Sequence, residues 1–65
     1  MSRAAVTYKT KEELRNLTTQ EINAYISWLK QRASYLRGPA RKSVEKRVVV
    51  AKKVRELTLA REGAK

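Results

Sequence analysis

The fold is decided by residues 22–39, INAYISWLKQRASYLRGP, in which apolar residues recur every three or four positions. They fall at offsets of 0, 3, 4, 7, 11 and 14, and they are Ile22, Tyr25, Ile26, Leu29, Ala33 and Leu36. This spacing predicts an amphipathic helix with one apolar face. Gly38 is a favoured helix-ending residue, and Pro39 cannot continue a helix but can open the next one, so we expect the chain to turn there.

Helix starts are marked by two Thr-x-x-Glu sequences, one at residues 10–13 and one at residues 18–21. In such a capping box the threonine hydroxyl accepts a backbone N–H three residues on, and the glutamate reaches back to the cap. We therefore expect a short helix at about 11–16 and a long helix at about 19–37. A second long helix is expected at about 39–61, or from Val44 if Ser43 is its cap. Its inner face is formed by Val44, Val48, Ala51, Val54 and Thr58, with Val50 and Leu57 on one shoulder.

Two long helices joined by a tight turn should lie side by side, so we expect an all-α protein built as an antiparallel two-helix hairpin. The short helix would close one end, and residues 10–63 would form a single domain. Residues 1–9 lack periodicity and are expected to form an extended arm, with Arg3 and Lys9 available for phosphate and Val6 and Tyr8 as anchors. The alternative is that Pro39 only kinks one long helix, which would then need to dimerise.

The composition argues against an enzyme. The 65 residues include no cysteine and no histidine, which removes disulfides, thiol nucleophiles, Cys/His zinc sites and the usual proton shuttle. No glycine-rich phosphate loop or carboxylate pair stands out, and the pattern is not that of a helix-turn-helix DNA reader. We expect no metal, no cofactor and no small-molecule substrate.

The net charge indicates a polyanionic partner. Sixteen basic against six acidic side chains give +10, and the sequence pI is about 10.6. Nucleic acid is the first candidate for such a protein. The longest apolar run covers only residues 48–51, and the first ten residues do not resemble a signal peptide. We therefore expect a soluble, cytoplasmic protein without a membrane partner.

Nearly all of the excess charge lies in residues 30–55, which hold ten basic side chains and one acidic one. Lys42, Lys46 and Lys53 fall on one side of the second long helix, opposite its apolar face, with Val49 among them. We call these three lysines the lysine line. Ammonium groups about a turn apart can follow successive phosphates of a nucleic-acid backbone. The alternatives are a plainly solvated helix face and an anionic membrane surface, although the latter would favour bulkier apolar residues opposite the lysines.

Further candidate contacts flank the lysine line. The guanidinium groups near the turn suit bidentate phosphate binding. The predicted nucleic-acid-binding residues are Arg32, Arg37, Arg41, Lys42, Lys46, Arg47, Lys52, Lys53 and Arg55. Trp28 and Tyr35 are seven residues apart and share a face, so they form an aromatic strip that either stacks on unpaired bases, docks a neighbouring protein, or covers the short helix or the arm.

The order of motifs resembles the large-subunit ribosomal protein family conventionally numbered twenty-nine. The resemblance covers residues 12 to about 60 and rests on ELRNLTTQE at 13–21, Leu29-Lys30, Leu36-Arg37, Pro39-Ala40-Arg41 and the basic helix that follows. Only Gly38 separates Arg37 from Pro39, a shorter connection than the family has. The resemblance implies a helical hairpin bound to large-subunit rRNA beside the polypeptide exit tunnel. It implies rRNA contacts at Arg15, Lys30, Arg32, Arg37, Arg41, Lys46, Arg47 and Lys52.

These observations lead to two hypotheses from different classes. The first is a structural RNA-binding protein, a ribosomal or ribosome-associated component that contacts rRNA and neighbouring proteins of the same assembly. The second is a small helical interaction protein, for instance a phage or virion component, or a regulator that docks on a larger protein or nucleoprotein machine. The first should lose affinity steeply with salt, and the second should not.

Overall fold

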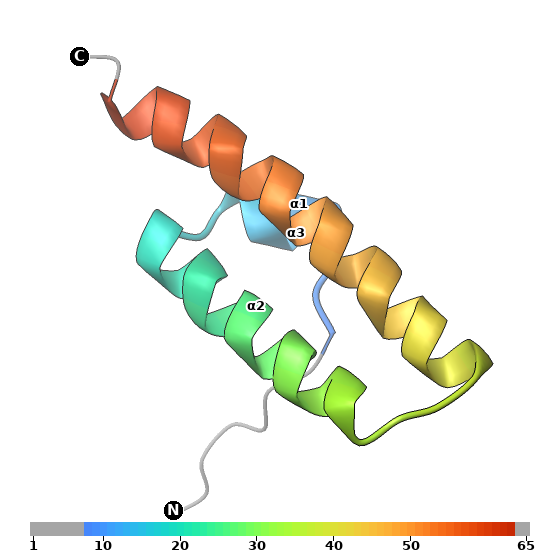
Figure 1. Cartoon of the computed structure of the whole chain (residues 1–65). Coiled ribbons are helices and arrows are strands. Elements are labelled where there is room, and N and C mark those ends of the chain that lie inside the picture. Colours follow the sequence, from blue (N-terminus) through green and yellow to red (C-terminus); the bar gives the residue numbers. More distant parts are fainter. Residues whose placement is uncertain (1–7, 64–65) are drawn as a thin grey trace, which may run out of the picture.

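Three α-helices and no strand make up residues 8–63, the part of the chain that the computed structural model describes (Figure 1). They are α1 (Lys11–Arg15), α2 (Thr19–Ser34) and α3 (Pro39–Gly63). The all-α class predicted from the sequence is confirmed. Of the residues expected in the N-terminal arm, Arg3 and Val6 lie outside the described residues.

Both predicted capping boxes are present, and they explain where α1 and α2 begin. The Thr10 hydroxyl accepts the Glu13 N–H at 3.1 Å, and the Glu13 carboxylate accepts the Thr10 N–H at 2.8 Å. Thr18 and Glu21 make the same pair of bonds at 3.2 and 2.9 Å. Each box provides hydrogen-bond acceptors for two backbone N–H groups that have no partner within the helix. The local sequence therefore determines where α1 and α2 begin.

The helix ends differ slightly from the sequence prediction. α2 ends at Ser34, before the predicted end near residue 37. The backbone N–H groups of Tyr35 and Leu36 donate to the carbonyls three residues earlier, those of Arg32 and Ala33, instead of four residues earlier as in an α-helix. Gly38 then adopts a positive φ of 65°, which reverses the chain and which side chains other than glycine rarely adopt. α3 begins at Pro39 and runs to Gly63, two residues beyond the predicted end. Pro39 therefore opens a separate helix instead of kinking a continuous one.

The core lies where the apolar faces of α2 and α3 meet (Figure 1). The residues predicted for the inner faces of the two long helices are buried, except that Leu36 is only partly buried. Leu14 of α1 joins them. The buried residues are Leu14, Ile22, Tyr25, Ile26, Leu29, Ala33, Val44, Val48, Ala51, Val54 and Thr58. The first turn of α2 contacts the last turn of α3, since the Thr19 hydroxyl donates to the Glu62 carboxylate at 2.6 Å.

α1 covers one side of α3 through Leu14, and an Arg61 guanidinium N–H donates to the Arg15 carbonyl at 3.0 Å. Just before α1, the backbone N–H of Lys9 donates to the hydroxyl of the buried Tyr25 at 2.9 Å, which fastens this segment to α2. None of the helices within residues 8–63 combines the length and apolar character needed to cross a bilayer. Leu57, on the shoulder of the predicted inner face, stays 62% exposed.

Candidate nucleic-acid interface

The lysine line lies on the outer face of α3. Lys42, Lys46 and Lys53 are all exposed, while Val48 and Ala51 on the same helix are buried against α2. Val49 is 52% exposed between the lysines. The helical period therefore separates a basic outer face from the core face, as the sequence predicted.

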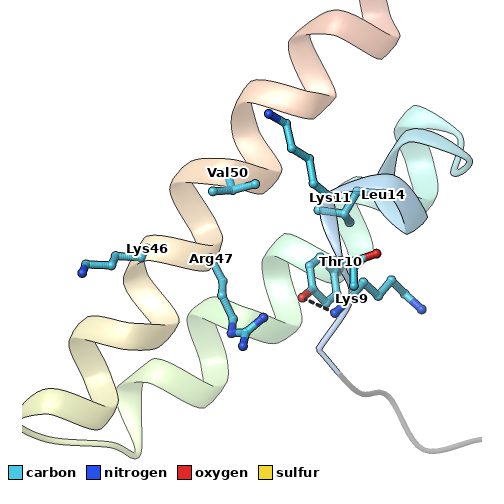
Figure 2. Close-up of a pocket in the computed structure, with 8 residues that line it drawn as sticks. Lys9, Thr10, Lys11, Leu14, Lys46, Arg47 and Val50 are labelled. Atoms are coloured by element: carbon cyan, nitrogen blue, oxygen red, sulfur yellow. Dashed lines mark hydrogen bonds between the residues drawn. The ribbon is translucent and has the colours of Figure 1, made fainter.

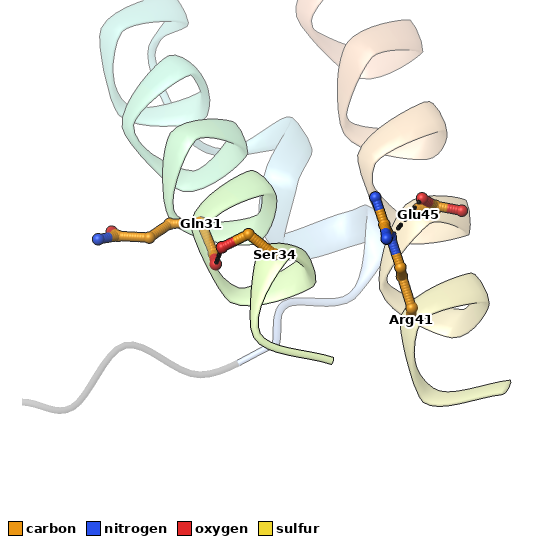
Figure 3. Close-up of polar contacts among 4 residues, drawn as sticks. All are labelled: Gln31, Ser34, Arg41 and Glu45. Carbon is orange, nitrogen blue, oxygen red and sulfur yellow. Dashed lines mark hydrogen bonds and ion pairs between the residues drawn. The ribbon is translucent and has the colours of Figure 1, made fainter. Parts of the chain in front are cut away.

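Few of these cations are neutralised within the protein. The one ion pair among residues 8–63 joins Arg41 to Glu45 at 3.2 Å, and both side chains are about half exposed (Figure 3). An exposed pair four residues apart stabilises a helix by only about 0.3–0.5 kcal/mol. Figure 3 shows the Arg41 side chain directed along α3 toward Glu45, with the Ser34–Gln31 hydrogen bond standing apart at the end of α2.

Three of the six carboxylates accept hydrogen bonds at helix ends. Glu13 and Glu21 complete the capping boxes, and Glu62 accepts two hydrogen bonds from Thr19. The first turn of α3 contains no acidic residue, although it holds Arg41. Because the start of a helix carries partial positive charge, a cation there is electrostatically unfavourable. Among residues 8–63 the basic face of α3 thus has only the Arg41–Glu45 pair as internal counter-charge.

Some of the predicted basic contact residues make no side-chain hydrogen bond within residues 8–63, and others do. Arg37, beside the turn, and Lys52 are exposed with no side-chain hydrogen bond among the described residues. Arg55 is only half-exposed and donates to the Asn23 side-chain oxygen at 2.9 Å, so it ties α3 to α2. It has fewer donors left for phosphate than the sequence suggested.

Two further arginines converge on an aromatic side chain that precedes α1. Arg32 Nε donates to the Tyr8 hydroxyl at 2.9 Å, and its Cζ lies 5.8 Å from the centre of the Tyr8 ring. Arg47 Cζ lies 4.2 Å from the same centre. Sequence reasoning predicted both arginines as contacts but missed their meeting, because it depends on the packing of three separate segments. The only sequence signal was Tyr8 itself, which was expected to anchor the arm.

The aromatic strip is split by burial. Trp28 is partly buried between Tyr8 and Tyr25, with ring centres 5.6 and 6.0 Å away. Tyr35 is 76% exposed. Trp28 and Tyr35 line one shallow hollow, together with Gln31 and Leu36. Trp28 therefore covers the end of the arm, which was one of the alternatives, whereas Tyr35 is available to an external partner.

A basic groove lies between α1, α3 and the segment before α1 (Figure 2). It encloses about 230 Å³ and has an apolar floor formed by Leu14, Tyr25 and Val50. Its cationic rim comes from Lys9, Lys11, Lys46 and Arg47. Lys9 was expected to serve phosphate, while Lys11 was not singled out from the sequence. The groove shows that basic side chains from outside α3 extend its positive face.

Nothing among residues 8–63 groups three or more His, Cys, Asp or Glu side chains in a way that could hold a metal ion. Comparison of the chain with protein-family models, with curated proteins and with solved structures finds no match.

Proposed function

We propose that this protein is a structural RNA-binding protein that contacts RNA phosphates through the basic face of α3 and has no catalytic role. In this proposal α2 and α3 act as an antiparallel hairpin, a stiff platform for that face. The observation that supports the proposal is the exposed lysine line in a region where Arg41–Glu45 is the one ion pair of residues 8–63. Cations left without internal partners repel one another unless an external polyanion lies against them.

The dimensions of the lysine line suit a nucleic-acid backbone. At 1.5 Å per residue, Lys42 and Lys46 stand about 6 Å apart along α3, and Lys42 and Lys53 about 16 Å apart. A line of this length passes several phosphates of one strand. Because the contacts are to phosphates, they position the protein without reading the base sequence.

Among RNAs, we propose rRNA, with the protein a component of the ribosome or of another cytoplasmic ribonucleoprotein particle. The support is the resemblance of residues 12 to about 60 to the large-subunit ribosomal protein family numbered twenty-nine. That resemblance adds Arg15 and Lys30 as rRNA contacts, and both side chains are exposed.

A second candidate function is that of a helical interaction protein, a phage or virion component or a regulator that docks on a larger machine. Exposed apolar side chains favour it: Val49 among the lysines, Leu57 and Leu59 farther along α3, and Tyr35 after α2. Isolated exposed apolar residues are common on soluble proteins. The basic face therefore carries more weight.

The two functions are separated by replacing the lysine line with neutral residues. In the variant Lys42→Gln, Lys46→Gln, Lys53→Gln, three phosphate contacts are lost. The wild-type protein, if it neutralises about six phosphates, should show a slope near −5 for log affinity against log salt. The variant should show a slope near −2 to −3, because each lost contact removes about 0.9.

The matched control adds charge to a face outside the proposed interface. The variant Gln20→Glu, Ala24→Glu, Ser27→Glu alters exposed positions of α2 and lowers the net charge of +10 by the same amount as the lysine variant. It should keep a slope near the wild-type value. If both variants lose affinity and slope equally, net charge and not the lysine line is responsible. If neither loses any, the interaction-protein function is favoured.

A further inference from the structure

The ring of Tyr8 lies in a slot whose walls are Trp28 and Arg32 of α2 and Arg47 of α3. The Arg47 guanidinium carbon is 4.2 Å from the ring centre, and the Trp28 ring centre is 5.6 Å away with the planes inclined at 59°. Arg32 Nε donates to the Tyr8 hydroxyl at 2.9 Å. We call these three side chains the Tyr8 slot.

The walls of the slot are held by the fold, but its occupant is not part of a helix. Trp28 packs against the core and stacks on the buried Tyr25, with ring centres 6.0 Å apart and planes 23° apart. Arg32 and Arg47 project from long helices. Tyr8 precedes α1 in extended chain and is 38% exposed. The ring can therefore leave while the indole stays stacked on Tyr25, with the Arg32 guanidinium carbon still 5.7 Å from the indole ring centre.

The chemistry of the walls is that of a base-binding site. Unpaired RNA bases stack on aromatic rings and on guanidinium planes, and their carbonyl oxygens accept hydrogen bonds at the base edge. Arg47 places its guanidinium carbon 4.2 Å from the centre of the bound ring, and the Trp28 ring lies beside it at an inclination of 59°. Arg32 donates a hydrogen bond to the hydroxyl oxygen of that ring. Neither Arg32 nor Arg47 forms an ion pair among residues 8–63, so both keep their charge for the phosphate of the same nucleotide.

We propose that the Tyr8 slot binds one unpaired nucleobase of RNA, and that the Tyr8 ring occupies this site until RNA displaces it. The inference rests on the proposed RNA-binding function and adds a base-dependent component to it. The lysine line would grip any folded RNA through phosphates. The slot would favour RNA that presents an unpaired base next to a helical stem.

Trp28 is the only tryptophan of the chain, so its fluorescence reports directly on the slot. The test uses three RNA hairpins with one stem: fully paired, with a single bulged uridine, and with an abasic residue at the bulge. Stacking one base on an aromatic side chain changes affinity by roughly 5- to 150-fold. Because Tyr8 must be displaced, we expect the bulged uridine to improve affinity about fivefold over both other hairpins. Only that hairpin should quench Trp28.

Three variants separate a base site from a simple latch for the arm. Tyr8→Ala removes the competing ring, so the advantage of the bulged uridine should grow to tenfold or more while affinity for the paired hairpin stays within twofold. Arg47→Lys keeps the charge but loses the guanidinium plane, so the advantage should fall toward parity. Gln20→Ala is the control, an exposed side chain in the first turn of α2 and outside the slot, and it should change neither affinity. Circular dichroism checks that each variant keeps its helices.

Each remaining result overturns something definite. Equal affinity for all three hairpins, in wild type and in Tyr8→Ala, overturns the base site while leaving phosphate binding intact. If Tyr8→Ala abolishes a preference that the wild type shows, Tyr8 is itself the stacking residue and the slot assignment is wrong. Failure of every hairpin to bind overturns both this inference and the proposed function.

Discussion

Leu29→Ala is the perturbation that most directly tests how the core supports the basic face. Leu29 has 0% of its surface exposed and lies at the centre of the α2–α3 contact. Replacing it removes three carbon atoms, which costs about 2.5 kcal/mol in lost burial at about 0.8 kcal/mol per carbon. The cavity left behind raises the expected total to about 3–5 kcal/mol.

This cost is large compared with the whole stability of so small a protein. At about 0.05–0.15 kcal/mol per residue, the 65-residue chain has a free energy of unfolding of about 3–10 kcal/mol. The variant should therefore lose between about a third and all of the free energy of unfolding. If RNA binds the folded form only, RNA at 100 times its Kd should return about 2.7 kcal/mol and restore much of the helix signal.

The assay is urea unfolding followed by circular dichroism at 222 nm, with and without the fully paired hairpin RNA. Leu59→Ala is the matched control, since Leu59 is 50% exposed and its loss should change the free energy of unfolding by less than about 0.5 kcal/mol. A cost below about 1 kcal/mol for Leu29→Ala would contradict the described core. If RNA shifts the urea midpoint of neither Leu29→Ala nor Leu59→Ala, RNA does not stabilise this fold.

Four smaller perturbations test other steps of the argument. Thr18→Ala removes the hydroxyl that caps α2 and should lower the free energy of unfolding by about 1 kcal/mol in urea titrations, with no change in salt slope. Gly38→Ala should cost about 1 kcal/mol by thermal unfolding because the position has a φ of 65° and its Cβ would meet no neighbour, so strain alone is measured. Ala40→Glu adds a carboxylate to the first turn of α3 and should raise Tm slightly while lowering the affinity for RNA. If Tm and RNA affinity both rise, the start of α3 does not bind an anion. Without RNA, the wild-type Tm should rise between 20 and 500 mM salt as repulsion among the cations is screened, and a falling Tm would count against that repulsion.

Helix starts and core residues could be predicted from the sequence because they depend on short-range patterns. The capping boxes at Thr10 and Thr18 involve residues three apart, and the buried face of α2 repeats at the helical period. The end of α2 was predicted less well. Gly38 marks where the chain turns, but α2 itself ends at Ser34 and the last three-residue hydrogen bond is donated by Leu36, and these positions have no strong local signal.

The candidate site was predictable only where it lies on one helix. The lysine line follows from the period of α3 alone. The meeting of Tyr8 with Arg32 and Arg47 joins residues 24 or more positions apart, and the Arg55–Asn23 bond joins residues 32 apart. Such contacts depend on how α2 and α3 settle against each other, which no local pattern specifies. Sequence reasoning named these arginines but could not say which ones the fold already holds.

The distribution of carboxylates connects the fold to the proposed function. The short α1 and the mid-length α2 begin with Glu12, Glu13 and Glu21, where acidic residues stabilise a helix start. α3 is 25 residues long and begins with none, although Arg41 lies in its first turn. A long helix with an inner face buried from Val44 to Thr58 depends less on a favourable start, because tertiary packing supplies most of its stability. The longest helix can therefore begin without an acidic residue in its first turn, and under the proposed function a phosphate backbone would complement its lysine line.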